Sequence, residues 1–238
     1  MDKKEIVSLV IPVFNEEKTL FRVLNAARDS GVDEIIVVDD GSTDASVPIC
    51  NDYVLGDSRI KLFFRKENMG TGATRRTGIL NSTGAIIVFL DSDIQNPSAR
   101  MIESLYEPIL KKQADFVLAS FENDGRITEL VAKPLLAVCF PELLFLDQPL
   151  SGQFSSRREF LFPQRIENGN GMLGIVLDAY LQNARITQIP IGKLLHTKRD
   201  IEIKKKQAQA ECRACLLRFL ESRPKNATDC KQKQLVEH

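Results

Sequence analysis

An alternation in the first 120 residues constrains the fold more than any other feature of the sequence. Short apolar runs rich in β-branched residues alternate with segments whose apolar residues recur at helical spacing. After the run at residues 6–13, for example, Leu20, Val23, Leu24 and Ala27 would form one buried face of a helix. Because the strand runs are apolar on both faces, they predict an α/β fold with a mostly parallel sheet covered by helices on both sides.

The same pattern predicts the other elements. Strands are expected at 35–38, 60–64, 85–90 and 115–119, and helices near Thr43 or Asp44, over 71–80, and from Asn96-Pro97 with Asn96 as the cap. The second half is less regular. It predicts helices at 128–139, 171–181 and 202–221, a strand at 186–191, and a polar segment at 148–158.

Composition excludes several classes of protein. The chain has 238 residues, 43% hydrophobic and 27% charged, as in soluble globular proteins. Its formal net charge is zero, so no nucleic-acid partner is expected. No apolar run is long enough to span a membrane, and the five cysteines are scattered, so we expect a cytoplasmic protein that makes no membrane contact. A homodimer is left open.

Polar side chains follow three of the predicted strands directly. Asn15-Glu16-Glu17 follow the first strand, Asp39-Asp40 the second and Asp91-Ser92-Asp93 the fourth. In open parallel sheets, ligands bind beyond the carboxyl ends of the strands, where these side chains would gather.

The residue types indicate a phosphate-bearing ligand with a metal ion. Asp91 and Asp93 would repel each other without a cation, and Mg²⁺ or Mn²⁺ prefers oxygen ligands. Asp39 and Asp40 could accept hydrogen bonds from a ribose or a base. Taken singly, each motif could also be a solvated acidic turn, or a helix cap in the case of residues 39–44.

Together, the motifs resemble the nucleotide-sugar glycosyltransferases of family 2, which have the GT-A fold. Pro12-Val13-Phe14-Asn15-Glu16, Asp39-Asp40-Gly41-Ser42-Thr43-Asp44 and Asp91-Ser92-Asp93 match their P-x-x-N-E, D-D-G-S-x-D and D-x-D motifs in the usual order. Residues 125–136 are similar to the G-R-V-T-E-L-x-A-R-P-L-L segment of glucosyl-3-phosphoglycerate synthases. Residues 148–158 are similar to their Q-P-L-x-G-E-[YF] segment and the R-R that follows.

This resemblance implies a role for each matching position. Pro12 and Glu16 would line the nucleotide pocket, Asp40 would lie by the base or ribose, and Asp91 would face the ribose. Asp93 and His196 would hold Mg²⁺ or Mn²⁺ and act in catalysis. Gly125, Arg126 and Thr128 would bind a small anionic acceptor such as 3-phosphoglycerate. The implied reaction transfers a sugar from a UDP- or GDP-sugar with retention of anomeric configuration.

Three positions depart from the synthase pattern. Thr71 stands where the synthases have lysine, Gln153 replaces an acidic residue, and Met172-Leu173 replaces a segment that would carry a glutamate for the sugar hydroxyls. Two alternatives therefore remain: a polyprenyl-phosphate glycosyltransferase and a catalytically degenerate nucleotide-sugar-binding protein.

The expected organisation is one GT-A domain at 1–222, a Rossmann-like sheet with a C-terminal acceptor-binding region. Residues 1–120 would bind the nucleotide sugar, residues 121–200 the acceptor, and residues 201–222 would form a C-terminal helix. A flexible tail is expected at 223–238, where large apolar residues are few.

Overall fold

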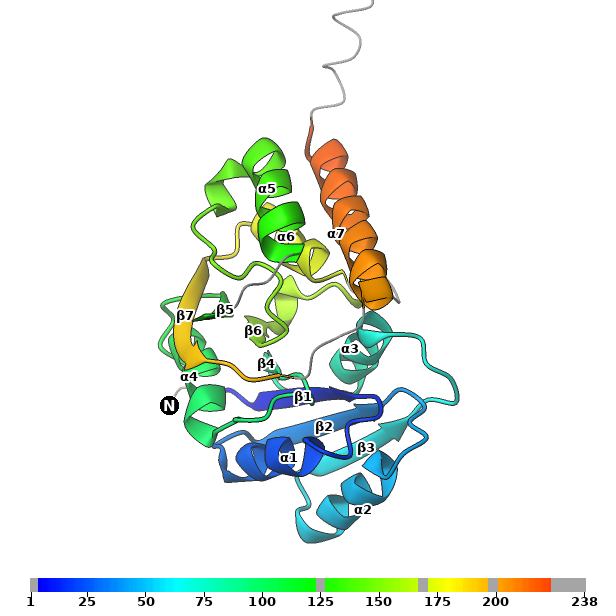
Figure 1. The fold of residues 1–238 in the computed structure, drawn as a ribbon. Helices are drawn as coiled ribbons and strands as arrows, with labels where there is room; N and C mark the ends of the chain where they lie inside the picture. The colour runs from blue at the N-terminus through cyan, green and yellow to red at the C-terminus, as the bar shows by residue number, and fades with distance from the viewer. Residues whose placement is uncertain (1–3, 123–126, 167–170, 197–200, 224–238) are drawn as a thin grey trace, which may run out of the picture.

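The computed structural model describes residues 4–122, 127–166, 171–196 and 201–223. The first half alternates strands and helices as predicted (Figure 1). In chain order its elements are β1 (Val7–Val13), α1 (Leu20–Asp29), β2 (Glu34–Asp39), α2 (Ser46–Gly56), β3 (Ile60–Phe64), α3 (Thr71–Asn81), β4 (Ile86–Phe89), α4 (Ala99–Leu110) and β5 (Phe116–Glu122). The second half contains α5 (Lys133–Cys139), β6 (Phe154–Arg157), α6 (Met172–Leu181), β7 (Ile186–Lys193) and α7 (Ile201–Ser222). The predicted flexible tail lies outside the described residues, apart from Arg223.

The strands described form one seven-stranded sheet in the order β3-β2-β1-β4-β6-β5-β7. β1 to β4 pair in parallel, and β5 pairs in parallel with β7. The predicted mostly parallel α/β sheet is therefore confirmed. Strand β6 runs antiparallel to both β4 and β5 in the middle of the sheet.

Strand β6 was not predicted, because Phe154-Ser155-Ser156-Arg157 is short and mostly polar. Tertiary contacts make it a buried strand. The Phe154 ring stacks on Phe89 and Phe116, with centroids 4.4 and 5.3 Å away, and the Ser155 hydroxyl donates to the Leu105 carbonyl at 2.6 Å. Both hydroxyls of this strand thus find partners inside the protein, since Ser156 also donates to a backbone carbonyl.

Helices cover both faces of the sheet, and each face has its own apolar core. One core contains Leu9, Ile11 and Ile35 with side chains from α1, α2 and α4. The other contains Val10 and Ile36 with side chains from α3, α5, α6 and α7. Alternate residues of β1 and β2 thus enter opposite cores, as expected for buried parallel strands.

The prediction that Asn96 caps the next helix was wrong. Helix α4 begins at Ala99, and its cap is Ser98, whose hydroxyl accepts a hydrogen bond from the Met101 N–H at 3.2 Å. The Asn96 side chain instead bonds the segment after β7: it donates to the Lys193 carbonyl at 2.8 Å and accepts from the Leu195 N–H at 2.9 Å. These long-range hydrogen bonds occupy the Asn96 side chain, so it does not cap α4.

The predicted helix at 128–139 is confirmed, but it begins with a wider turn. Residues Thr128–Ala132 form a π-helical turn, and the Lys133 N–H donates to the Thr128 carbonyl five residues earlier. Pro134 follows at once, in the first turn of α5, where its missing N–H costs least. A π-type turn thus lets the chain pass a proline without ending the helix.

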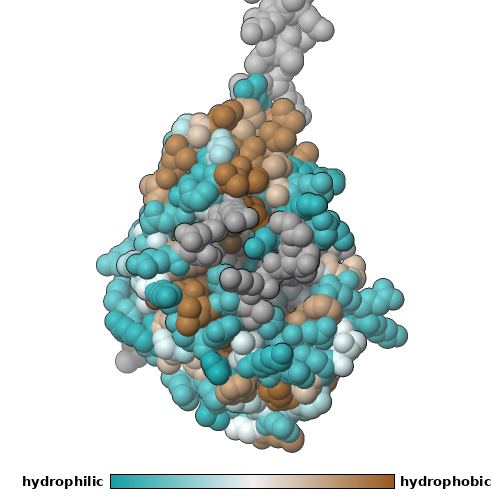
Figure 2. All heavy atoms as spheres, in the orientation of Figure 1, coloured by the Kyte–Doolittle hydropathy of each residue, from teal (hydrophilic) through white to brown (hydrophobic). Residues whose placement is uncertain are grey.

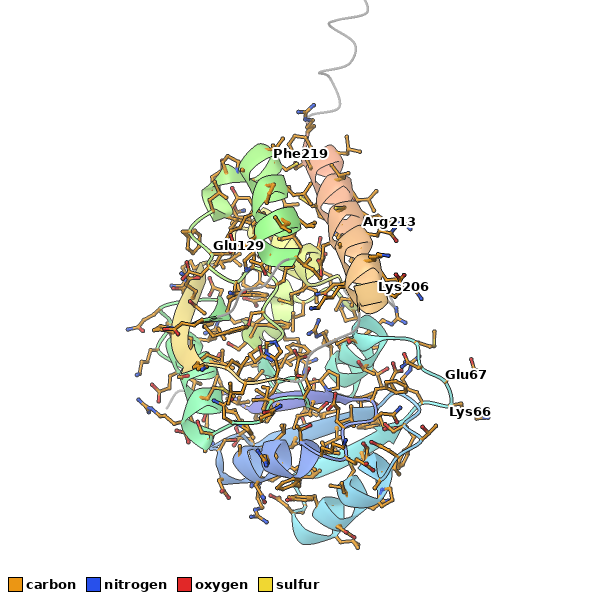
Figure 3. All side chains as sticks on the ribbon, in the orientation of Figure 1. Lys66, Glu67, Glu129, Lys206, Arg213 and Phe219 are labelled. Atoms are coloured by element: carbon orange, nitrogen blue, oxygen red, sulfur yellow. The ribbon has the colours of Figure 1, made fainter. Side chains whose placement is uncertain are left out.

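Helix α7 lies beside α6 with a mixed inner face (Figure 1). Glu211, Ala214, Cys215 and Arg218 are buried at the spacing of one helix face. Lys206 and Arg213 lie on the outer face, pointing away from α6 (Figure 3). The buried face of this helix therefore carries two ionisable groups as well as apolar ones.

The surface is mostly hydrophilic in the view of Figure 2, with hydrophobic residues gathered at the end formed by α5 and α7. Exposed apolar side chains on these helices include Val138, Leu216 and Leu220. Among the helices that the structure describes, none has the length and apolar character needed to cross a membrane.

Candidate active site

The loops after β1 and β2 interlock at the carboxyl ends of these strands. Asn15 adopts a positive φ of 53°, and its side-chain oxygen accepts a hydrogen bond from the Thr43 N–H at 2.8 Å. The Glu16 N–H donates to the Ser46 hydroxyl at 2.9 Å. The half-buried carboxylate of Glu16 accepts from the Thr19 hydroxyl at 3.0 Å. The P-x-x-N-E segment is therefore held against the acidic loop that follows β2.

The Asp91-Ser92-Asp93 segment joins the same edge. The Ser92 hydroxyl donates to the Pro12 carbonyl at 2.7 Å, so the end of β4 is tied to the end of β1. Asp93 is 6% exposed and Asp91 is half-buried. The structure thus brings the Asp91–Asp93 segment to Pro12, as the strand-end pattern predicts, and Glu16 lies on the loop that follows the same strand β1.

His196 reaches this edge from the far end of the chain. Ile94 and His196 pair as an isolated antiparallel bridge, and the Gln95 N–H donates to the Leu195 carbonyl at 2.8 Å. The contacts of Asn96 with Lys193 and Leu195 reinforce this pairing. His196 is exposed and lies next to the segment that carries Asp93. The two residues expected to share a metal ion therefore lie on adjacent segments.

These two side chains fit a metal that a substrate helps to bind. A carboxylate and an imidazole suit Mn²⁺ or Mg²⁺ when oxygen ligands complete the shell. Within the described residues, no group of three or more His, Cys, Asp or Glu side chains could hold a metal ion by itself. Diphosphate oxygens would supply the missing ligands.

The Asp40 carboxylate binds backbone N–H groups of the loop before α3. Its carboxylate accepts hydrogen bonds from the Met69 N–H at 3.1 Å and the Gly70 N–H at 2.7 Å, and it lies 3.1 Å from Nε of Arg65. The predicted contact of Asp40 with a base or ribose stays a prediction. Its neighbour Asp39 is also buried, and its Oδ2 atom accepts from the N–H groups of Gly41 and Ser42.

Only one of the three predicted acceptor residues lies in the described part of the chain. Thr128 is buried at the start of the π-helical turn, and its hydroxyl donates to the side-chain oxygen of Gln148 at 3.4 Å. Gly125 and Arg126 lie outside the described residues. Thr128 thus contacts Gln148, the first residue of the segment 148–158. Gln153 of the same segment donates a hydrogen bond to Asp91.

Arg75 and Glu211 were not predicted from the sequence, where Gln153 was treated only as a departure from the synthase motif. Arg75 lies 3.4 Å from Oδ1 of Asp91, and Gln153 donates to Oδ2 of Asp91 at 3.1 Å. Glu211 of α7 accepts hydrogen bonds from the N–H groups of Met172 and Leu173, at 3.2 and 2.8 Å. For Arg75, the available signal was the presence of an arginine among the small residues of α3. No local pattern could show the pairing of α7 with α6.

Glu211 has a strongly perturbed carboxyl group. It is fully buried, and burial raises its pKa to about 7 despite the N–H bonds from α6 and the nearby charge of Arg75, which act to lower it. It caps a helix whose own first residues offer no side-chain cap. The residues that replace the glutamate-bearing segment of the synthases, Met172 and Leu173, are those that bind Glu211 through their backbone.

Comparison with known proteins agrees with this geometry. The profile of Glycosyl transferase family 2 matches residues 8–167. The glucosyl-3-phosphoglycerate synthase of Mycobacterium tuberculosis (strain H37Rv) is 31% identical over 225 residues, which cover 82% of this chain and 68% of the relative. The enzyme of the same name from Mycolicibacterium smegmatis is 31% identical over 216 residues, with 82% and 71% covered.

Solved structures of the M. tuberculosis synthase have the same fold. The complex with Mn²⁺, UDP-glucose and phosphoglyceric acid matches with a TM-score of 0.80 and 30% identity, covering 90% of this chain and 80% of that one. The complex with Mg²⁺ and UDP gives a TM-score of 0.80 and 29% identity, with 90% and 79% covered. The parallel strands, the motifs at their ends and these similarities agree: the chain belongs to Glycosyl transferase family 2 and is a nucleotide-sugar glycosyltransferase with the GT-A fold.

Proposed function

We propose that this protein transfers glucose from UDP-glucose to 3-phosphoglycerate, or to a closely similar small anionic acceptor, with Mn²⁺ or Mg²⁺ bound. The observation that carries the proposal is the meeting of Pro12, Asp91 and Asp93 with the His196 segment at one sheet edge. Solved relatives with about 30% identity hold Mn²⁺, UDP-glucose and phosphoglyceric acid. GDP-sugars are the alternative donors.

Each residue in the proposal has a task that its chemistry allows. Pro12 and Glu16 line the nucleotide pocket, Asp40 lies by the base or ribose, and Asp91 accepts hydrogen bonds from the ribose. Asp93 and His196 hold the cation. Bound there, a divalent ion supplies positive charge that stabilises the leaving diphosphate.

The acceptor-binding half, residues 121–200, binds the second substrate. Gly125, Arg126 and Thr128 hold the acceptor anion, because guanidinium and hydroxyl groups donate to phosphate or carboxylate oxygens. The hydroxyl oxygen of 3-phosphoglycerate forms the new bond to the anomeric carbon as the bond to the diphosphate breaks. The hydroxyl proton leaves with the departing group or with solvent. Retention of the anomeric configuration is part of the proposal, on the basis of the family resemblance.

Incubation of the purified protein with UDP-glucose and 3-phosphoglycerate tests the proposal. We expect UDP and a glucosylated acid to form in equal amounts with Mn²⁺ or Mg²⁺, and neither to form in excess chelator. The coupling constant of the anomeric proton in the product reports retention or inversion. Nucleotide binding without consumption of UDP- or GDP-sugars, with 3-phosphoglycerate and glycerol 3-phosphate both present, would support a binding protein instead.

A further inference from the structure

The Asp91 carboxylate is held on both of its oxygens by side chains that the family motifs do not assign. Arg75 of α3 approaches Oδ1 at 3.4 Å, and Gln153 beside β6 donates to Oδ2 at 3.1 Å. Gly152 completes the enclosure: a Cβ atom there would lie 1.9 Å from Oδ2 of Asp91. Two segments distant in sequence, α3 and residues 152–153, therefore fix the orientation of one carboxylate.

Arg75 is itself held rigidly. Its side chain is 3% exposed, and its guanidinium lies over the Phe154 ring, 5.7 Å from the centroid. A buried guanidinium needs anionic partners, and among the described residues two carboxyl groups interact with it. Asp91 contacts it directly, and Glu211 of α7 is close enough for the two charges to interact. Arg75 is thus a buried cation that contacts the Asp91 carboxylate and also interacts with the carboxyl group of Glu211.

This balance explains why residue 153 is a glutamine in this chain. The Ser151 hydroxyl lies 3.4 Å from the side-chain oxygen of Gln153, which turns the amide nitrogen toward Asp91. A glutamate at this position would add a further carboxylate beside Arg75 and repel Asp91 at about 3 Å. Glutamine donates a hydrogen bond at that point instead. Gln153 departs from the synthase motif, which by itself suggests impaired activity. In this chain the glutamine instead suits the charge of Arg75.

We propose that Arg75 and Gln153 are positioning residues for Asp91, and that together with Glu211 they form a charge-balanced clamp that sets affinity for the nucleotide-sugar donor. The inference rests on the proposed function, because it assigns Asp91 to the ribose. A carboxylate fixed in advance loses less conformational freedom when it accepts the ribose hydroxyls. Loss of the clamp should therefore raise KM for the donor and leave KM for the acceptor unchanged.

Gln153→Glu is the sharpest variant, because it restores the acidic residue of the synthase motif and preserves side-chain size. We expect KM for UDP-glucose to rise at least about tenfold, a typical cost for a repelled or lost partner of a charged group. Gln113→Glu adds the same charge at an exposed position and should leave both KM values unchanged. In the double variant Gln153→Glu with Glu211→Gln, removal of one carboxylate should recover part of the donor KM.

Arg75→Lys tests the cation itself, since lysine keeps the charge but loses the planar geometry. The matched control is Arg218→Lys, because Arg218 is also buried and bonded to a carboxylate, that of Asp178, at 2.8 Å. Both variants should lower the melting temperature, but only Arg75→Lys should raise KM for the donor.

The outcomes separate this inference from the proposed function. If the wild type consumes no nucleotide sugar, the proposed function fails and the clamp fails with it. If the wild type is active and Gln153→Glu and Arg75→Lys change only the melting temperature, the proposed function stands and the clamp is overturned. The same holds if Gln153→Glu raises the donor KM and the Glu211→Gln background recovers none of it, because charge balance would then play no part.

Discussion

The two halves of the molecule are organised by different kinds of contact. From β1 to β5, every strand was predicted from local apolar runs, and the pairs among β1, β2, β3 and β4 are parallel. In the second half, distant segments provide the key contacts: β6 enters between β4 and β5, His196 pairs with Ile94, and Glu211 caps α6. Local periodicity thus specifies the first half, whereas buried polar pairs fix the second.

The largest expected effect breaks a buried ion pair in the second half. Arg218 and Asp178 are 6% and 7% exposed and lie 2.8 Å apart, and Arg218 joins α7 to α6. Arg218→Ala removes this partner but leaves Asp178 2.8 Å from Arg165, so the free energy of unfolding should fall by about 3–4 kcal/mol, toward the lower end of the range for a broken buried pair. Chemical denaturation measures the loss. A loss below about 1 kcal/mol would show that α6 and α7 do not depend on the pair.

A smaller effect, which depends on pH, is expected from Glu211. Burial raises the pKa of this carboxyl from 4.5 to about 7, so the folded protein binds a proton that the unfolded chain has released between these pH values. Its contribution to stability is full below pH 4.5 and is lost as pH rises through about 7, by roughly 3 kcal/mol in total.

Glu211→Gln removes this titration. The stability of the wild type relative to the variant should therefore fall between pH 5 and pH 8, as measured by urea denaturation at both values. Comparison with the variant cancels the contribution of Asp33, Glu34 and Asp115, whose lowered pKa values act in more acidic solution. An equal stability difference at both pH values would contradict the assignment.

The smallest effect is expected from an exposed ion pair in the first half. Lys4 lies 2.5 Å from Asp33, but its side chain is 79% exposed. Lys4→Ala should change the free energy of unfolding by less than about 1 kcal/mol, because solvent screens such pairs. Asp33 would keep its bond from the Val7 N–H. If Lys4→Ala lowered the free energy of unfolding as much as Arg218→Ala does, the two halves would not differ in how strongly they depend on ion pairs.

The predictable part of the fold was the part encoded by local pattern. Apolar runs predicted β1 to β5 and β7. Strands β1, β2 and β4 are buried on both faces and are therefore apolar almost throughout, whereas the edge strands β3 and β7 are only partly buried. Strand β6 could not be predicted, since Ser155 and Ser156 become buried only when this strand pairs with β4 and β5. Asn96 is a residue type that favours helix caps, but its side chain forms hydrogen bonds with Lys193 and Leu195 instead.

The candidate site divides in the same way. Pro12 lies near the end of β1, and Asp91 and Asp93 follow β4, so the sheet rule was sufficient to bring them together. The family resemblance was needed to select His196, which has no local signal. Arg75 and Glu211 were missed because their meeting depends on how α3 and α7 pack, which local periodicity does not encode.

The most direct test of the proposed site measures Mn²⁺ binding in the presence of UDP by calorimetry. The wild type should bind Mn²⁺ together with UDP, and both Asp93→Asn and His196→Ala should weaken that binding and lower turnover roughly a hundredfold or more. Asp52→Asn, an exposed carboxylate change on α2, should behave as the wild type does. Unchanged Mn²⁺ affinity in both site variants, with the fold intact, would contradict a metal centre shared by the two halves.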